Sequence, residues 1–419
     1  MDLLGNGASA AKDQDRRAKI ENRKSKTGRR RYDETVSKTI RILQLITELR
    51  PGGAERIVYE LARGMPRERF QVEVCALRPA TGAVADWLRK ADVPVHSLEM
   101  TRKLDIGAIG RLRALLKNGA FRILHTHLFH ANLVGRLAAR SGEPSIVLGT
   151  IHIAERRFRP WHFWLDRMTL GPRGLEVCVS EAVRTFTQRQ AGIPQEQLRV
   201  IPNGVDLSRF DRYGDAQARA EAARELRSEF GWPEDTFVAV AVGRLEEQKG
   251  YPDLLDAWAR LRSDPRPQVA EARLIIAGEG TRRNALEAQI TRLGLAKRIR
   301  VPGHQEDVPG FLAAADLLAF SSHYEGFGLA LVEALASGLP IVATSVDSIP
   351  GVVGDCPAAR LVPPRNPAAL AKALGEMISL PETERASLAT AARERAKVFA
   401  LPKMLDAYAT LYEELLPKG

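Results

Sequence analysis

Short runs of β-branched and apolar residues alternate along the chain with segments of helical periodicity. In the first half, the strand-like runs cover residues 39–46 ("TIRILQLI"), 72–77, 122–127, 145–152 and 176–180. Segments with apolar residues at helical spacing, such as 54–65 and 106–119, lie between them. Strands that alternate with helices predict a parallel sheet covered by helices on both faces.

The pattern breaks at residues 199–210 ("RVIPNGVDLSRF") and resumes at 236–245, followed by strand-like runs at 272–278, 316–322 and 339–344. We therefore expect two Rossmann-like α/β domains, residues 39–203 and 204–400, with a hinge near 203–206. Ligands of such sheets bind at the carboxyl ends of the strands. Two facing domains would place those ends across one cleft. A final amphipathic helix, about 402–417, should pack on one of the domains.

Composition indicates an intracellular enzyme. The chain has 419 residues, 45% hydrophobic and 27% charged, and three widely spaced cysteines that form no disulfide or zinc pattern. No apolar run approaches the roughly 20 residues that span a bilayer, and the N-terminus lacks the pattern of a signal peptide. We predict a cytoplasmic protein that can meet a membrane only as a peripheral partner at its inner face.

The basic charge is concentrated at the N-terminus. The net charge is +11, and residues 1–38 hold eleven Lys/Arg and six Asp/Glu, which gives +5. The segment 12–31 has too few apolar residues to form a core, so residues 1–38 are predicted to be a basic disordered tail. It could be a solvated tail without a partner, or it could bind an anionic membrane. Nucleic acid is less favoured because no aromatic residues interleave with the charges.

Two loops at strand-to-helix turns carry candidate phosphate ligands. Gly52 and Gly53 follow the first strand, where glycines let backbone N–H groups approach an anion. A plain tight turn explains them as well, and the dinucleotide motif G-x-G-x-x-G is absent there. Arg244 and Lys249 follow the strand at 236–245, and two cations suit a diphosphate. Local pairing with neighbouring Glu246 and Glu247 is the alternative.

A third loop, "EGFG", precedes a helix from about Gly328 that is apolar on all sides except for Glu333. A carboxylate buried without a partner costs several kcal/mol. Glu333 therefore needs donors, from a protein cation or from a ligand diol such as ribose. Glu325, eight positions earlier, lies in the loop itself.

Histidines and aromatic residues mark a further region. His125 and His127 share one strand face, and His127 could line an acceptor pocket or be a buried, hydrogen-bonded histidine. A metal site is disfavoured because no acid or thiol lies nearby. The segment 154–168 ("AERRFRPWHFWLDRM") mixes aromatic and basic residues, which is typical of a membrane interface, although these rings could instead pack in the core.

These motifs together resemble a known family. "EGFGLALVEALASGLPIVAT" is similar to the E-x7-E signature of retaining glycosyltransferases of family 4, which have the GT-B fold. "VGRLEEQKGYPDLL", "VIPNGVD" and "PGGAER" resemble the family's other motifs, in the same order, from about residue 39 to the end. The first domain would then bind the acceptor and the second the donor, and the last helix would pack back on the first domain.

The resemblance implies roles for matching residues. Arg244 and Lys249 would hold the donor diphosphate, Glu333 the ribose, and Glu325 would face the sugar. The implied catalytic residues are Glu325, His152, Arg244 and Lys249. The implied donor-binding residues are Gly53, Arg244, Lys249, Glu325, Gly326, Phe327, Gly328, Leu329 and Glu333. The implied acceptor-binding residues are His127 and Gly52.

We accordingly expect a retaining, metal-independent glycosyltransferase without a cofactor. It would move a sugar from a nucleotide-sugar donor to a saccharide or lipid-linked acceptor in cell-surface polysaccharide or glycolipid biosynthesis. Anionic membrane contact would run through residues 12–31 and 154–168. The alternatives are a nucleotide-sugar epimerase or a sugar-phosphate synthase with the same fold.

Overall fold

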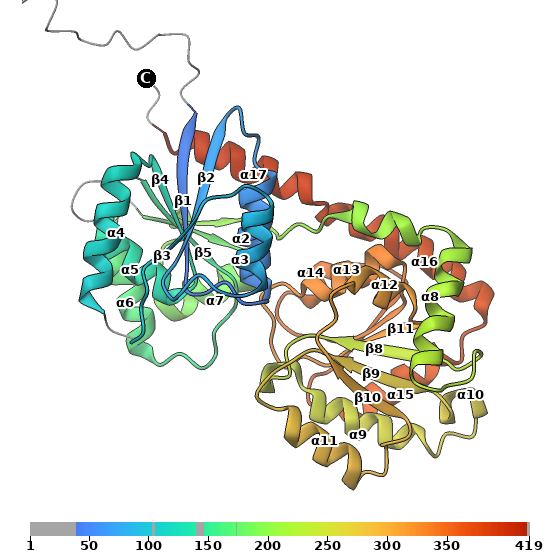
Figure 1. The fold of residues 1–419 in the computed structure, drawn as a ribbon. Coiled ribbons are helices and arrows are strands. Elements are labelled where there is room, and N and C mark those ends of the chain that lie inside the picture. Colours follow the sequence, from blue (N-terminus) through green and yellow to red (C-terminus); the bar gives the residue numbers. More distant parts are fainter. Residues whose placement is uncertain (1–38, 103–104, 140–145, 173, 417–419) are drawn as a thin grey trace, which may run out of the picture.

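The computed structural model describes residues 39–102, 105–139, 146–172 and 174–416. Two parallel sheets, each covered by helices, lie beside one another (Figure 1). The prediction of two parallel-sheet α/β domains is confirmed. The tail, residues 1–38 including 12–31, lies outside the described residues.

The first sheet has seven parallel strands in the order β3-β2-β1-β4-β5-β6-β7. They are β1 (Ile40–Ile46), β2 (Phe70–Ala76), β3 (Val95–Ser97), β4 (Ile123–His127), β5 (Ile146–Ile151), β6 (Leu175–Cys178) and β7 (Leu198–Val200). The connecting helices are α2 (Gly53–Gly64), α3 (Ala83–Lys90), α4 (Ile106–Gly119), α5 (Phe129–Ala139), α6 (Pro160–Leu170) and α7 (Glu181–Ala191). The strand order reverses between β1 and β4, which is where doubly wound sheets bind ligands.

The second sheet has six parallel strands in the order β10-β9-β8-β11-β12-β13, with its reversal between β8 and β11. They are β8 (Val238–Val242), β9 (Arg273–Ala277), β10 (Ile299–Gly303), β11 (Leu317–Phe320), β12 (Ile341–Thr344) and β13 (Ala359–Val362). The helices are α8 (Ala216–Glu229), α9 (Tyr251–Leu261), α10 (Pro267–Ala270), α11 (Arg283–Arg292), α12 (Val308–Ala313), α13 (Leu329–Ser337), α14 (Ile349–Val353), α15 (Pro367–Ile378), α16 (Glu382–Ala396) and α17 (Leu401–Glu414).

Helix α17 returns to the first domain (Figure 1). Met404, Tyr408 and Tyr412 are buried on it and pack in the core of the first sheet. The two connections between the domains lie together, because the Val205 N–H donates to the Phe399 carbonyl at 2.9 Å and the Leu401 N–H donates to the Val205 carbonyl at 2.8 Å. Any movement of one domain relative to the other must bend both connections at this point.

Within the described part of the chain, no helix has the length and apolarity needed to cross a membrane.

Candidate functional site

The candidate residues gather where the two strand orders reverse. The loop after β1 carries Gly52 and Gly53, the loop after β8 carries Arg244 and Lys249, and the loop after β11 carries Glu325. Since β1 and β8 each adjoin the reversal of their own sheet, these loops lie at the ligand-binding edge of each domain.

Lys249 and Glu325 form an ion pair across two loops of the second domain. The Lys249 ammonium contacts Oε1 of Glu325, and the Ser322 hydroxyl donates to the same oxygen at 3.1 Å. Only 16% of the Lys249 side chain and 7% of the Glu325 side chain are exposed. Lys249 therefore pairs with Glu325 instead of with its acidic neighbours in the sequence, so the local-pairing alternative is wrong for Lys249.

The backbones of these two loops are also joined. The His323 N–H donates to the Gln248 carbonyl at 2.7 Å, and the Gln248 side-chain amide donates to the Tyr324 carbonyl at 3.0 Å. The Ser321 hydroxyl donates to the Lys249 carbonyl at 2.8 Å. The ammonium and the carboxylate are thus fixed before any ligand arrives, which is what electrostatic preorganisation requires.

Arg244 is the second cation of this edge, and its side chain is exposed. Among the described residues, its guanidinium has neither a hydrogen-bond partner nor an ion-pair partner. Its positive charge nevertheless opposes the rise that burial causes in the pKa of Glu55, and together with Arg157 it favours the lowered pKa of Glu155; both acids belong to the first domain. Arg244 therefore faces the gap between the domains with its hydrogen-bonding capacity unused.

Glu333 lies on the face of α13 that it shares with Leu329 and Ala330. Although the helix is apolar on all its other sides, this face is partly exposed, and 18% of the Glu333 side chain is accessible. Burial raises the pKa of Glu333, whereas Arg56 and Arg209 oppose that rise. Its Oε1 lies 3.9 Å from the Arg209 guanidinium, too far for a hydrogen bond. The acid therefore keeps acceptor capacity for a further donor.

The glycine loop of the first domain lies opposite the beginning of α13. A Cβ placed on Gly53 would lie 3.6 Å from Cδ1 of Leu329. At Gly52 the equivalent position is taken by the Glu55 carboxylate, 2.2 Å away. A ligand at the start of α13 would thus have the Gly53 backbone on its other side.

The loop Glu325–Gly328 leads into α13. Phe327 turns its ring into the core, where it packs edge-on against Phe399 at 5.3 Å between centroids, so only its backbone can face a ligand. Gly328 begins the helix with φ of 86°. The first N–H groups of an α-helix have no acceptor within the helix, and they carry a partial positive charge. This helix start can therefore receive an anion or a sugar hydroxyl.

His152 contacts two buried histidines of β4, His127 directly and His125 through it. Its Nε2 lies 3.0 Å from Nδ1 of His127, whose ring lies tilted against that of His125 at 4.1 Å between centroids. His125 in turn bonds to the Tyr412 hydroxyl of α17 at 2.7 Å. Burial lowers the pKa of His152 to about 3, so its imidazole is neutral. His127 has no exposed surface, so the prediction that it lines an acceptor pocket is wrong, and the buried alternative holds.

Glu55 is a cleft residue that the sequence did not indicate. Burial raises its pKa to about 7, and Arg244 opposes the rise. A glutamate in the first turn of a helix is common, because its negative charge interacts favourably with the positive end of the helix dipole. This one is unusual because its burial raises the pKa even though Arg244 of the second domain opposes the rise.

The aromatic segment divides between core and surface. Phe158 and Phe163 pack against other rings of the first domain. Trp161, Trp164 and Met168 are 52%, 60% and 56% exposed, and they follow one another along one side of α6 at helical spacing. The phenylalanines are therefore half-buried against other rings, whereas the tryptophans lie on the surface.

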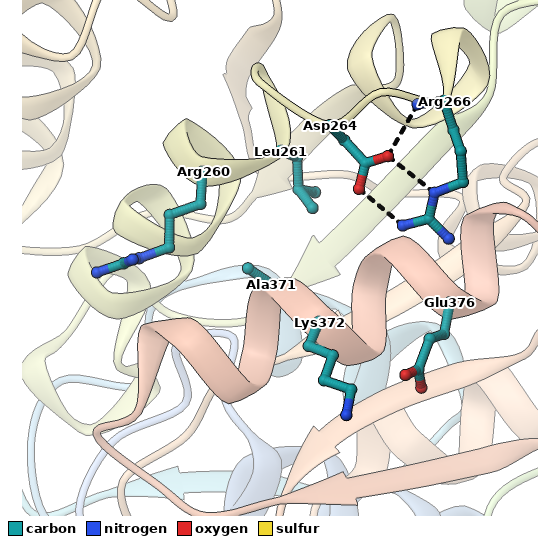
Figure 2. Close-up of a pocket in the computed structure, with 7 residues that line it drawn as sticks. All are labelled: Arg260, Leu261, Asp264, Arg266, Ala371, Lys372 and Glu376. Atoms are coloured by element: carbon teal, nitrogen blue, oxygen red, sulfur yellow. Dashed lines mark hydrogen bonds and ion pairs between the residues drawn. The ribbon is translucent and has the colours of Figure 1, made fainter.

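A cavity of about 380 Å³ lies elsewhere, on the second domain between α9 and α15 (Figure 2). Asp264 on its rim already accepts both a side-chain and a backbone hydrogen bond from Arg266. The cavity contains none of the candidate residues. Its lining consists of Arg260, Leu261, Asp264, Arg266, Ala371, Lys372 and Glu376.

Two facing parallel-sheet domains, with a glycine loop at the strand reversal of the first and two cations and a helix start at that of the second, are the arrangement of a GT-B glycosyltransferase. The family model "Glycosyltransferase Family 4" matches residues 51–209, and "Glycosyl transferases group 1" matches residues 222–395. The D-inositol 3-phosphate glycosyltransferase of Salinispora arenicola is 31% identical over 399 residues, which cover 87% of each chain. The protein belongs to the family 4 glycosyltransferases of the GT-B fold and is a transferase of the EC 2.4 class.

Other relatives differ in what their names state. The Escherichia coli UDP-Gal:alpha-D-GlcNAc-diphosphoundecaprenol alpha-1,3-galactosyltransferase is 26% identical over 305 residues, 70% of this chain and 76% of that enzyme. Among solved structures, Anabaena Alr3699/HepE in complex with UDP and glucose superimposes with a TM-score of 0.77 at 25% identity. The superposition covers 90% of this chain and all of that one.

Proposed function

We propose that this protein is a retaining glycosyltransferase that moves a sugar from a nucleotide-sugar donor, first of all a UDP-sugar, to a saccharide or lipid-linked acceptor. One observation carries the proposal: Arg244 and Glu333 keep unused hydrogen-bonding capacity at the ligand-binding edge of the second domain, beside the fixed ion pair of Lys249 and Glu325. The relatives whose names mention UDP support the choice of donor.

The donor would lie along the second domain with its diphosphate between the start of α13 and the two cations. Arg244 would fork onto phosphate oxygens, and Lys249 would add a point charge. Glu333 would accept both hydroxyls of the ribose, for which its acceptor-only carboxylate is suited. Gly53 and Gly52 would close the site from the first domain, which would bind the acceptor.

The contacts of Glu325 favour front-side attack. Its Oε1 is occupied by Lys249 and Ser322, so the carboxylate is held as part of a fixed network instead of being free to attack the anomeric carbon. In the front-side route, the departing diphosphate accepts the proton of the acceptor hydroxyl. Arg244 and Lys249 would stabilise the charge that develops on this leaving group, and His152 would contact the sugar as a neutral group.

We further propose that these cations supply the charge that a metal ion supplies in other transferases. Transfer should therefore continue in excess chelator.

The acceptor side of the site adjoins α6. Trp161 and Trp164 project from the same domain as His152, and Arg159 and Arg167 lie on either side of them along the chain. Exposed tryptophans with neighbouring cations suit the headgroup layer of an anionic membrane. We propose that residues 154–168 hold the enzyme at a membrane surface, where a lipid-linked acceptor would be presented.

The test is an assay of both donor and acceptor. Calorimetry with a panel of nucleoside diphosphates identifies the base, and the matching nucleotide sugars are then incubated with lipid-linked saccharides and followed by mass spectrometry. Transfer with retained anomeric configuration supports the proposal. Release of nucleoside diphosphate without a glycosylated product would instead indicate an epimerase, and transfer to a sugar phosphate would indicate a synthase. Failure of every nucleotide to bind would overturn the proposal.

A further inference from the structure

Asp347 has an unusual backbone conformation in the turn that follows β12. Its φ is 42°, in the left-handed region that few residues other than glycine adopt. Residues held in such a conformation persist where the surrounding structure fixes them, and they concentrate at functional sites. The contacts of the Asp347 side chain are therefore informative.

The Asp347 carboxylate joins three segments of the chain. Its Oδ2 accepts the backbone N–H of Glu325 at 2.9 Å, on the loop after β11. Its Oδ1 forms an ion pair with the guanidinium of Arg156, which belongs to the first domain. Only 11% of the Asp347 side chain is exposed. One carboxylate thus connects the backbone of the sugar-site acid to the opposite domain.

A second contact from the first domain reaches the next residue of the same loop. The Ser180 hydroxyl donates to the Gly326 carbonyl at 2.7 Å. The hydroxyl oxygen of Ser180 also accepts the Val183 N–H at 3.2 Å, which makes Ser180 the N-cap of α7. The N–H of Glu325 and the carbonyl of Gly326 are therefore both held from outside the loop, and one of these contacts comes directly from the other domain.

We propose that Asp347 is a positioning residue that fixes the backbone of Glu325, and that Asp347, Arg156 and Ser180 together form an interdomain latch. When the domains meet, the latch completes the loop that faces the donor sugar. The catalytic consequence rests on the proposed function, because it assumes that Glu325 works at the sugar. The latch itself rests only on the contacts. Neither Asp347 nor Ser180 takes part in the chemistry proposed above.

Asp347→Gly is the decisive variant. Glycine adopts a positive φ without strain, so the variant should fold with a thermal midpoint close to that of the wild type. Without the carboxylate, we expect kcat to fall on the order of 10- to 100-fold while the KM for the donor changes little, because misplacement of a catalytic group acts on the chemical step. Asp347→Asn should restore most of kcat, since its amide oxygen can still accept the Glu325 N–H.

The matched control is Asp92→Gly. Asp92 is an exposed aspartate with φ of 55° in the turn after α3, remote from the cleft. It should show the same small change in stability and wild-type kcat.

A second pair of variants separates the contact that Ser180 makes with Gly326 from its role as an N-cap. Ser180→Gly keeps most of the N-cap preference but lacks the hydroxyl, and Ser180→Thr keeps both. We expect kcat to fall only in Ser180→Gly.

Hydrogen exchange tests the latch without any activity. The amide of Glu325 should exchange about tenfold faster in Asp347→Gly than in the wild type or in Asp92→Gly. If the wild type transfers no sugar at all, the proposed function fails, and the exchange comparison still decides the latch. Unchanged exchange at Glu325 together with unchanged kcat would overturn the latch and leave the proposed function standing.

Discussion

Nδ1 of His127 lies 3.0 Å from Nε2 of His152, and burial lowers the pKa of both imidazoles, so both rings are neutral. In such a pair one ring must donate and the other must accept. His127 therefore determines which nitrogen of His152 carries the proton, and so whether His152 offers a donor or an acceptor at its other nitrogen.

We expect His127→Leu to lower kcat roughly tenfold, which corresponds to the loss of one hydrogen bond of about 1.4 kcal/mol. The KM for the donor should stay within about twofold of the wild-type value. His127→Asn, whose amide can take the place of the bonded ring nitrogen, should retain most of kcat. Steady-state kinetics of the three proteins would measure this, and equal kcat in all of them would contradict a role for His127.

Arg244→Ala and Glu333→Ala should each weaken the binding of nucleoside diphosphate by about 1–3 kcal/mol, the usual cost of leaving a charged hydrogen-bonding partner unpaired. Calorimetry would measure both. Arg282→Ala is the control, because Arg282 is an exposed arginine of the same domain that pairs only loosely with Glu247, at 3.4 Å. Wild-type affinity in both test variants would refute their assigned roles.

The pKa of Glu55, raised by burial from 4.5 to about 7, makes stability depend on pH. Between these values the folded protein keeps a proton that the unfolded chain has released, so this group's contribution to stability is lost as the pH rises through the window. Glu55→Gln removes the titration. The thermal midpoint of the variant minus that of the wild type should be larger at pH 8 than at pH 5. The same difference at both pH values would show that Glu55 titrates normally.

Much of the fold follows from the sequence, because the central strands are short, continuous apolar runs. β1 and β8 are buried along nearly their whole length, as expected of parallel strands covered on both faces. The edge strands β3, β10 and β13 were not predicted. Their residues are largely half-buried or exposed, so no apolar run distinguishes them from loops.

The candidate site likewise has a part that the sequence predicts and a part that it does not. Lys249 and Glu325 are each visible in the sequence, because each belongs to a motif that is local along the chain. The contacts that complete the site are not local: Arg156 and Asp347 are separated by 191 residues, and Ser180 and Gly326 by 146. Their pairing exists only after two domains have folded and met, so no periodicity or spacing in the chain announces it.

Replacing both Trp161 and Trp164 by serine should reduce the recovery of the enzyme on anionic vesicles in a flotation assay. The exposed rings would no longer enter the headgroup layer, although the neighbouring arginines would still attract the lipid. Val398→Ser is the control, since Val398 is another exposed apolar side chain, 46% accessible, outside α6. Equal recovery of the wild type on neutral and anionic vesicles, or no recovery at all, would defeat the membrane proposal.

Gly326 of the second domain lies against the backbone of His152 and Ile153 of the first. A Cβ at this position would lie 1.8 Å from the carbonyl oxygen of His152, a distance at which the backbone must shift. We therefore expect Gly326→Ala to hold the domains apart and to lower kcat on the order of 100-fold, because the acceptor and the donor would no longer meet in the right geometry.

The matched control for this last variant is Gly110→Ala. Gly110 lies within α4, and a Cβ there would meet nothing within 4 Å, so the substitution should stabilise the helix by about 0.5–1 kcal/mol and leave kcat unchanged. Small-angle scattering in the presence of nucleoside diphosphate would show whether Gly326→Ala is more extended than Gly110→Ala. If both variants were equally compact and equally active, the domains would not need to approach as closely as the contact between Gly326 and His152 indicates.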